Sequence, residues 1–307
     1  MSEPLIELRH ARKTFRTRQG RINALVDVNL AVQEGDVFGL LGANGAGKTT
    51  AMRGILGLTR LDAGAVRLAG RERVDRRSFF RQAAYLPEEP QFYQGATGRE
   101  HLLYFGRLCE LTGARLRGRV DESLAVVGLS DAADRPIAGY SKGMKQRLGV
   151  AAAILHEPRI VFLDEPTRGL DPLARREVRD LLQSLAARGA TLFLNSHLLS
   201  EVERLCNRVA ILDRGEVRVQ GLLSELLVES EHIDVQFALP PGVDPAAFGP
   251  ATAAEKGTWK AIVADTAALA DLAGRLARAG GRVIAARAAR VDLEDYLVRV
   301  VKENELA

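Results

Sequence analysis

Short apolar runs alternate with amphipathic stretches over residues 37–220 of the chain. The runs "VFGLLG", "RIVFLDEP", "TLFLNSH" and "RVAILDRG" are typical of buried strands, and the stretches between them place apolar residues at helical spacing. Buried strands that alternate with helices predict a mainly parallel sheet with helices on both faces. Residues 98–155 are almost wholly helical in pattern, which predicts a helical insert within this α/β unit.

The two ends of the chain carry different patterns. Before the alternating region, "IELRHARKTF" and "INALVDVNLAV" alternate apolar and polar positions and predict an N-terminal antiparallel β layer. The strand pattern of "HIDVQFAL" later opens a stretch that mixes strand and helix patterns. We therefore expect an α/β domain over residues 1–221, a linker over 222–232 and a small α+β domain over 233–307.

The composition fits two folded domains and argues against a membrane span. The chain has 307 residues, of which 47% are hydrophobic and 27% charged, enough for one large core and one small one. Its longest apolar stretches fall short of the roughly 18 residues that would suggest a span, and its start lacks a secretory signal pattern. We therefore expect a cytoplasmic location, with another chain crossing any membrane at which this one works.

The charge balance leaves a nucleic-acid partner open without favouring one. The net charge is +4 and the pI is near 9.2, and a basic surface attracts phosphate backbones. The basic clusters "RRSFFR" and "ARLRGR" fit a solvated helix face, or a face that meets a partner, at least as well. We expect no nucleic acid among the partners.

The stretch "VFGLLGANGAGKTT" predicts a P-loop, because a buried strand leads into G-x-x-x-x-G-K-T and then into a helix. Glycines let backbone N–H groups converge on the β-phosphate, and the helix start adds positive charge. We expect Lys48 to bridge the β- and γ-phosphates and the Thr49 hydroxyl to bind Mg²⁺. The residues of the loop expected to bind the nucleotide are Gly42, Asn44, Gly45, Gly47, Lys48, Thr49 and Thr50.

Two carboxylates follow the apolar strand in "RIVFLDEP". Successive side chains of a strand point to opposite faces, so Asp164 and Glu165 are expected to have different tasks. We assign Asp164 to Mg²⁺ through water and Glu165 to the polarisation of the water that attacks the γ-phosphate. The chain is thus predicted to have a P-loop NTPase core that binds and hydrolyses a nucleoside triphosphate with Mg²⁺.

Together these segments resemble the ATP-binding subunit of an ABC transporter, and this resemblance implies that the nucleotide is ATP and that the chain is an ATPase. The motifs "GANGAGKTT", "YSKGMKQRL", "VFLDEP", "GLDP" and "NSH" occur in the order of that family, and the resemblance covers about residues 4–220. It implies that Ser141 and Gly143 contact the γ-phosphate of a nucleotide held by the opposite subunit. A hydroxyl and N–H groups at a helix start form an anion site, which a partner would fill.

The resemblance assigns roles to three more residues. His197 in "NSH" is expected to contact the γ-phosphate, which makes it catalytic together with Glu165 and Lys48. Asp171 in "GLDP" is expected on the loop that communicates between the two nucleotide sites. Phe15 matches the aromatic residue that stacks on adenine.

The chain departs from the family pattern at four positions. In the signature segment, Lys142 replaces the first glycine and Met144 replaces the glutamine. Glu88 stands where most members have the glutamine that senses Mg²⁺ and the attacking water. A carboxylate suits a neighbouring Mg²⁺ but repels a γ-phosphate, so we expect stricter metal dependence. Arg168 stands where a serine usually precedes the "GLD" turn.

The resemblance also implies partners. They are a multi-span membrane permease and a second ATP-binding subunit, with a homodimer expected, at the cytoplasmic face of the membrane. The motif variants and the added C-terminal domain are most similar to bacterial exporters of drugs, polysaccharides or lipids and to ATPases of copper-enzyme maturation. An alternative is a soluble ABC-type ATPase that acts on nucleic acid or ribosomes. The short helical insert argues against chromosome-type relatives, which carry a long coiled coil there, and the single cassette argues against translation-associated ones.

Overall fold

A computed structural model describes residues 3–18, 20–72, 75–254, 258–290 and 292–303. By its internal contacts the chain divides into two compact units. The first comprises Met1–Leu223 together with Val300–Ala307, and the second comprises Ser224–Arg299. Among the described residues, no helix has the length and apolar character that crossing a bilayer requires.

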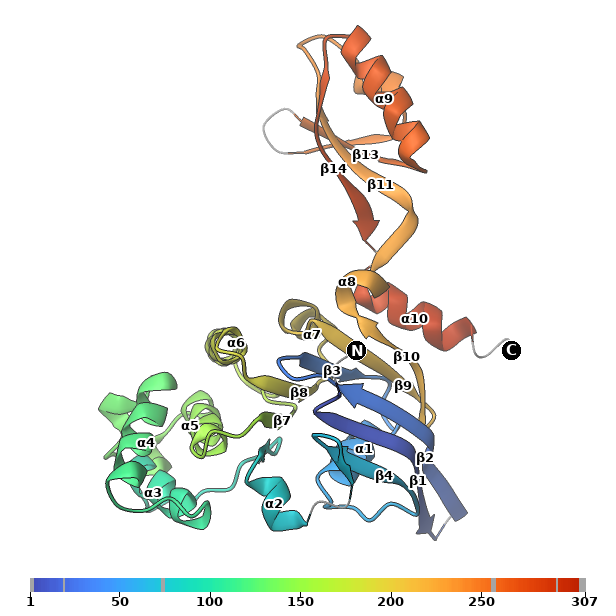
Figure 1. Cartoon of the computed structure of the whole chain (residues 1–307). Coiled ribbons are helices and arrows are strands. Elements are labelled where there is room, and N and C mark those ends of the chain that lie inside the picture. The colour runs from blue at the N-terminus through green and yellow to red at the C-terminus, as the bar shows by residue number, and fades with distance from the viewer. Residues whose placement is uncertain (1–2, 19, 73–74, 255–257, 291, 304–307) are drawn as a thin grey trace. The chain divides into compact units, whose positions relative to one another are not determined.

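A six-stranded sheet forms the centre of the first unit (Figure 1). The strand order is β10-β9-β3-β8-β7-β6, and all neighbours are parallel except the antiparallel pair of β9 and β10. The mainly parallel sheet is therefore confirmed. The strands are β3 (Val37–Leu41), β6 (Ala83–Leu86), β7 (Ile160–Asp164), β8 (Thr191–Asn195), β9 (Arg208–Asp213) and β10 (Glu216–Leu222).

A four-stranded antiparallel sheet of order β2-β1-β4-β5 accompanies it, as the N-terminal pattern predicts. Its strands are β1 (Ile6–Thr17), β2 (Gly20–Val32), β4 (Ala63–Leu68) and β5 (Arg71–Glu72). The expected helical insert is also present. The helices of this unit are α1 (Lys48–Ile55), α2 (Arg76–Phe80), α3 (Gly98–Leu108), α4 (Gly113–Val126), α5 (Lys142–Ile154), α6 (Pro172–Ala187) and α7 (Leu199–Leu205).

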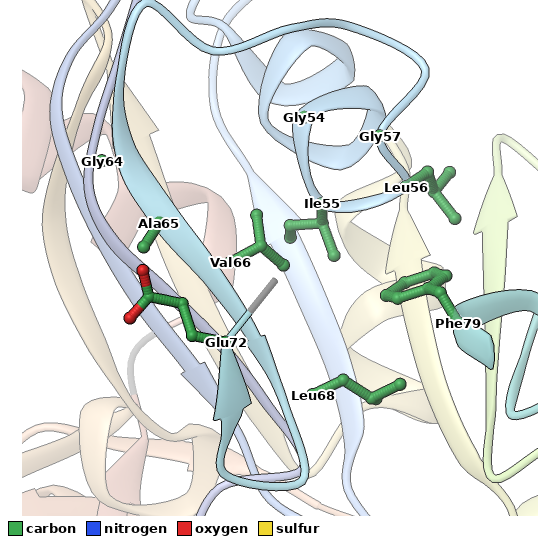
Figure 2. Close-up of a pocket in the computed structure, with 10 residues that line it drawn as sticks. All are labelled: Gly54, Ile55, Leu56, Gly57, Gly64, Ala65, Val66, Leu68, Glu72 and Phe79. Carbon is green, nitrogen blue, oxygen red and sulfur yellow. The ribbon is translucent and has the colours of Figure 1, made fainter. Parts of the chain in front are cut away.

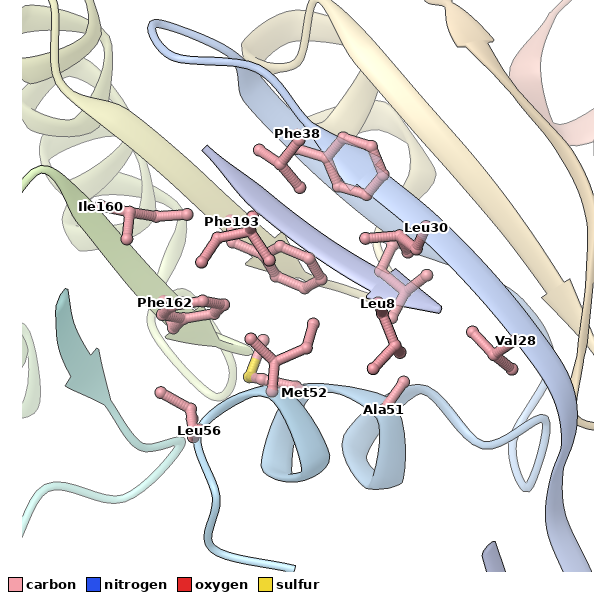
Figure 3. Close-up of a cluster of buried hydrophobic side chains, with 14 of the residues drawn as sticks. Leu8, Val28, Leu30, Phe38, Ala51, Met52, Leu56, Ile160, Phe162 and Phe193 are labelled. Carbon is pink, nitrogen blue, oxygen red and sulfur yellow. The ribbon is translucent and has the colours of Figure 1, made fainter. Parts of the chain in front are cut away.

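The main core lies between the two sheets and α1 (Figure 3). The rings of Phe38 and Phe162 lie 5.3 Å and 5.2 Å from the ring of Phe193, measured between centroids. Ala51 and Met52 of α1 pack against this layer and against side chains of β1 and β2. Burial of each such large side chain contributes roughly 1.5–3 kcal/mol. This core fixes α1, and with it the loop before α1, against the ends of the parallel strands.

The opposite face of the six-stranded sheet is covered by helices of the same unit. At Gly39 of β3, an added Cβ atom would lie 2.8 Å from the Val202 side chain of α7. At Gly149 of α5, it would lie 2.6 Å from the Leu86 side chain of β6. Glycine at both positions thus lets helix and strand approach closely.

The second unit contains an antiparallel sheet of order β12-β13-β11-β14 with α9 on one face. Its core includes Val235, Phe237 and Leu276. The predicted linker over residues 222–232 is instead occupied by α8 and the start of β11, because β11 extends well beyond the part that alternates in sequence. The elements from Leu223 onward are α8 (Leu223–Leu226), β11 (Val228–Ala238), β12 (Ala251–Ala253), β13 (Thr258–Val263), α9 (Thr266–Arg278), β14 (Arg282–Arg290) and α10 (Leu293–Glu303).

Candidate active site

The predicted phosphate loop, strand carboxylates and Glu88 meet at the carboxyl ends of β3, β8 and β7, which are adjacent in the sheet. A cavity of about 260 Å³ lies there. Parallel α/β sheets place their ligands outside these strand ends. The cavity is lined by Ala24, Asn44, Gly45, Gly47, Lys48, Thr49, Thr50, Glu88, Asp164, Glu165, Arg168 and Asn195.

The loop between β3 and α1 needs its glycines for different reasons. Gly42 and Gly47 have φ values of 146° and 107°, and an added Cβ atom would overlap a backbone oxygen, that of Leu212 or Ala24 respectively. Gly45 has φ 84° but has open space in front of it. Its backbone is therefore free to be approached by a ligand. This arrangement fits a polyphosphate cradle at the start of α1.

The Lys48 side chain folds back over the loop. Its Nζ atom donates to the carbonyl oxygens of Gly42 and Ala43 at 2.7 Å and 3.1 Å. Burial lowers the pKa of Lys48, and the carboxylates of Glu165 and Asp164 oppose this effect. A cation with little water around it interacts strongly with an incoming phosphate.

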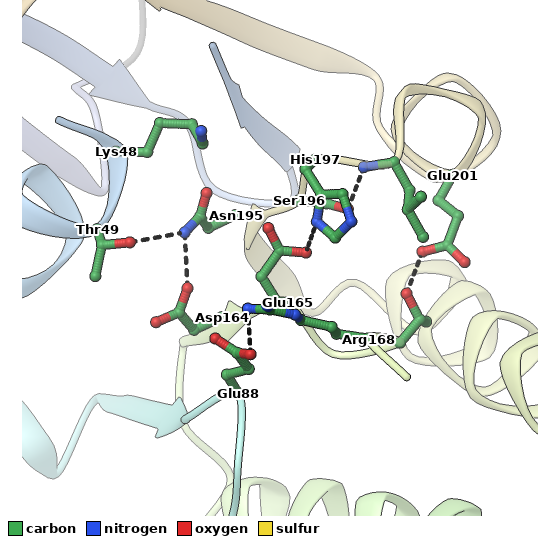
Figure 4. Close-up of polar contacts among 12 residues, drawn as sticks. Lys48, Thr49, Glu88, Asp164, Glu165, Arg168, Asn195, Ser196, His197 and Glu201 are labelled. Atoms are coloured by element: carbon green, nitrogen blue, oxygen red, sulfur yellow. Dashed lines mark hydrogen bonds and ion pairs between the residues drawn. The ribbon is translucent and has the colours of Figure 1, made fainter. Parts of the chain in front are cut away.

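Asp164, Thr49 and Asn195 form a polar group at the ends of β7 and β8 (Figure 4). The Asn195 amide donates to Asp164 Oδ1 at 2.7 Å and lies 3.5 Å from Thr49 Oγ1. Tyr85 of β6 donates to Asp164 Oδ2 at 3.2 Å. Burial first, and the Asp164 charge second, raise the pKa of Tyr85, so its hydroxyl remains a donor. A hydroxyl and a carboxylate held together fit Mg²⁺, which prefers a few hard oxygen ligands shared with phosphates.

Glu165 begins a sharp turn directly after β7. Its φ of 49° is unusual for a residue with a side chain, and its backbone N–H donates to the backbone carbonyl oxygen of Asn195 at 2.8 Å. Its Oε2 atom lies 2.6 Å from Nδ1 of His197. Burial raises the pKa of Glu165, while the contact with His197 lowers it. The carboxylate thus lines the cavity with a raised proton affinity and a fixed orientation.

Two of the residues that depart from the family pattern contact each other at the cavity. Arg168 Nη1 forms an ion pair with Glu88 Oε1 (Figure 4). A third, Lys142, reaches Gly169, the residue after Arg168, because a Cβ atom added at Gly169 would overlap the Nζ atom of Lys142. Sequence reasoning gave no partner for any of them.

Six predicted residues are not among those that line the cavity, namely Gly42, Phe15, Ser141, Gly143, Asp171 and His197. Ser141 caps α5 by accepting from the N–H of Met144 at 3.2 Å. Asp171 caps α6, where it accepts from the N–H groups of Leu173 and Ala174. At Gly143 an added Cβ atom would lie 2.8 Å from the Cβ atom of Ala174. The close packing of α5 and α6 therefore favours glycine here without any phosphate.

Phe15 is another predicted residue outside the cavity lining. It lies on β1 with 40% of its surface exposed. The Lys13 ammonium lies 5.3 Å from its ring centroid. An exposed ring on a rigid strand offers a flat surface that a base can stack on, and the predicted role of Phe15 stays a prediction.

Sequence reasoning missed Asn195, Tyr85 and a second polar group behind the site. Asn195 ends a buried strand within the quoted "NSH", so the argument used for Asp164 would have found it. The second group joins the turn after Glu165 to α7, because the Thr167 hydroxyl donates to Glu201 Oε2. Glu201 is 4% exposed, and Arg175 Nε lies 3.7 Å from its other oxygen. This contact links the turn to the segment that follows His197.

A second cavity, of about 310 Å³, lies between the end of α1 and β4 (Figure 2). Leu56, Leu68 and Phe79 contribute to its apolar lining, and its one charged side chain is Glu72. A cavity with this lining does not suit a polyphosphate. The cavity beside Lys48, with its glycine loop and its lysine, fits a polyphosphate better.

Comparisons with known proteins agree with this geometry. Residues 25–168 match the family model described as "ABC transporter". An ABC transporter ATP-binding protein of Synechocystis sp. is 38% identical over 98% of this chain and 85% of its own length. The Nod factor export ATP-binding protein I of Paraburkholderia xenovorans is 37% identical over 81% of this chain and 80% of its own.

Among solved structures, an ATP-binding subunit of an ABC transporter matches with a TM-score of 0.64 and 34% identity. The match covers 72% of this chain and 91% of that one. Shared sequence along nearly the whole chain, shared fold and the polar residues at the strand ends lead to one conclusion. The chain belongs to the family of ABC transporter ATP-binding subunits, whose ATPase activity is coupled to transport.

Proposed function

We propose that the chain binds ATP with Mg²⁺ in the cavity beside Lys48, dimerises around two ATP molecules and powers a separate permease that exports its cargo. The observation that carries this proposal is the meeting of Lys48, Thr49, Asp164 and Glu165 at one cavity. A cation for phosphates, two oxygen ligands for a metal and a carboxylate for the attacking water are the parts that hydrolysis of a phosphoanhydride needs.

The residues of the site act on different parts of the reaction. Lys48 would bind the β- and γ-phosphates, and Thr49 and Asp164 would hold Mg²⁺, which would supply positive charge to offset that of the phosphates. Glu165 orients the attacking water and accepts its proton. The raised pKa of Glu165 makes its carboxylate a stronger base than an ordinary glutamate at neutral pH. His197 fixes one of its oxygens.

The second half of each site would come from the opposite subunit. Ser141 accepts one backbone N–H and keeps its own hydroxyl proton for a further acceptor. Its place at the start of α5, outside the cavity of its own chain, suits a phosphate brought by another chain. ATP then favours the closed dimer because the Ser141 and Gly143 segments contact phosphate in that state alone.

A permease is the partner that we propose beyond the dimer, on the basis of the ATPase chemistry and of the named relatives. A subunit that hydrolyses ATP for transport needs a chain that crosses the membrane, so we place this one at the cytoplasmic face, bound to a permease. Export is supported by the relative named for Nod factor export. Purification of the tagged chain from detergent-solubilised membranes should retain a multi-span protein in stoichiometric amount. Recovery of ribosomal or DNA-bound partners alone would favour the soluble alternative.

The dimer is tested with Glu165→Gln, which removes the base and keeps the shape of the side chain. With ATP and Mg²⁺ this variant should run as a dimer in size-exclusion chromatography with light scattering, and as a monomer without ATP. A double variant that carries Ser141→Ala together with Glu165→Gln should form a weaker dimer and should still bind ATP as a monomer. A Glu165→Gln protein that stays monomeric at saturating ATP would contradict the shared-site proposal.

A further inference from the structure

The Glu88–Arg168 ion pair lies at the cavity of the candidate site and not elsewhere on the surface. The two residues come from segments about eighty residues apart in sequence. Glu88 follows β6, and Arg168 lies in the turn after β7, the strand that pairs with β6. Both residues stand where most family members carry an uncharged side chain. The two departures therefore meet in space as opposite charges.

The Glu88–Arg168 contact changes the balance of charge around the cavity. Three carboxylates line it, those of Glu88, Asp164 and Glu165, against two cations, Lys48 and Arg168. Asp164 accepts a hydrogen bond from Asn195, and Glu165 lies against His197. Glu88 has Arg168 as its cationic partner. A triphosphate that enters this cavity interacts with all five charged groups. Its repulsion by the three carboxylates costs free energy, because like charges lie at close range.

We propose that Arg168 is a positioning residue of the ATP site that acts through Glu88. Its guanidinium offsets the Glu88 carboxylate, so that the polyanionic triphosphate can enter a cavity in which carboxylates outnumber Lys48. Arg168 is needed because Glu88 carries the opposite charge, so removal of both charges should leave the affinity for ATP nearly unchanged. The inference rests on the proposed assignment of this cavity to ATP.

A plain surface ion pair is the competing explanation. The side chains are 57% and 36% exposed for Arg168 and Glu88, and such pairs contribute little to folding stability. The two explanations differ in what they predict. A surface pair leaves nucleotide affinity unchanged when it is removed, whereas a charge-offsetting pair changes the affinity in one direction for Arg168 and in the other for Glu88.

The contribution of Arg168 should depend on metal and on salt. Mg²⁺ brings two positive charges that offset Glu88 directly, so the loss of Arg168 matters most when ATP enters without metal. Salt screens exposed charges over roughly 10 Å at 0.1 M, so the effect should shrink as ionic strength rises. Neither dependence is expected of a residue that only supports the turn.

The test measures the dissociation constant of ATP by isothermal titration calorimetry on the full chain, with EDTA and then with Mg²⁺. The variants are Arg168→Ser, Glu88→Gln, the double variant and the charge-conserving Arg168→Lys. Arg176→Ser is the matched control, because it removes an exposed arginine that lies outside the cavity. Unchanged melting temperatures show that each variant is folded.

With EDTA at low salt, Arg168→Ser should weaken ATP binding about three- to tenfold. The double variant should return to within about twofold of the unmodified chain, and Arg168→Lys and Arg176→Ser should stay close to it. An unaffected Arg168→Ser protein would overturn the inference. A double variant as weak as Arg168→Ser would also overturn it, since Arg168 would then act on the phosphates directly. Failure of the unmodified chain to bind ATP would instead overturn the proposed function together with the inference.

Discussion

Nδ1 of His197 lies 2.6 Å from Oε2 of Glu165 across the end of the sheet. The contact joins the residue expected to act on the water to the residue expected to touch the γ-phosphate. Burial raises the pKa of Glu165, and this histidine holds it lower than burial alone would. The histidine therefore affects both the orientation and the proton affinity of the carboxylate.

Replacement of His197 by alanine should shift the acid side of the ATPase pH profile upward. Glu165 acts as a base only when it is deprotonated, and loss of His197 removes the group that lowers its pKa. Activity should fall roughly 10- to 100-fold at neutral pH, and the remaining kcat should decline at a higher pH than in the unmodified chain. The measurement is kcat from pH 5 to 9 at saturating ATP. An unmoved acid limb in His197→Ala would show that His197 does not tune Glu165.

Asn195→Ala should raise the Mg²⁺ concentration needed for half-maximal ATPase activity. The amide is the donor that orients Asp164 toward Thr49, and loss of such a supporting group typically weakens metal affinity about 10- to 100-fold. A magnesium titration at fixed ATP measures the effect. Asn207→Ala is a suitable control, because Asn207 bonds to Val37 and Asp36 at the other end of β3. Equal magnesium dependence of the two variants would count against the role of Asn195.

Phe15→Ala should weaken nucleotide binding if the ring stacks on adenine. A base that stacks on an aromatic side chain gains about 1–3 kcal/mol, so the dissociation constant of ATP should rise at least several-fold. Ile22→Ala serves as the control, since Ile22 pairs with Phe15 on the neighbouring strand and is 55% exposed. Calorimetric titration of both variants decides the matter. Similar affinities would remove Phe15 from the site.

His101 should make the helical insert sensitive to acid. Its ring is 4% exposed and lies 4.9 Å and 4.6 Å from the rings of Phe92 and Phe105. Burial lowers its pKa to about 4. The folded chain thus keeps His101 neutral while the unfolded chain protonates below the ordinary value near 6.5, so stability is full above that pH and is lost as pH falls toward 4.

The size of this loss can reach roughly 2–3 kcal/mol in the free energy of unfolding. His101→Leu has no proton to gain and should lose less stability between pH 7 and pH 4. Denaturant titrations of both proteins at several pH values measure the difference. Parallel pH profiles would show that another group, such as the half-buried His156 with its lowered pKa, dominates instead.

Part of the site could be predicted from the sequence because its residues lie in contiguous motifs. The strand, the glycine loop and Lys48 follow one another along the chain, so their relative positions are set by local geometry. Asp164 and Glu165 were found in the same way. Asn195 pairs in register with Asp164 because β7 and β8 are neighbours in the sheet, and strand order is a tertiary property that periodicity does not encode.

The Glu88–Arg168 contact could not be predicted from the sequence for the same reason. The sequence showed two departures and no relation between them, since Glu88 follows β6 and Arg168 follows β7. The alternating pattern that starts at Ile233 marked only part of β11, which begins at Val228. Strand length depends on pairing partners such as β14, which a local pattern does not contain.

The position of Ser141 outside the cavity of its own chain has a genetic consequence. In the proposed dimer each ATP lies between Lys48 of one subunit and Ser141 of the other. A chain damaged at Lys48 and a chain damaged at Ser141 are each inactive as homodimers. When they pair, both lesions fall on the same ATP and the other site is intact. Two defective alleles expressed together can therefore complement each other, whereas two alleles damaged at Lys48 cannot.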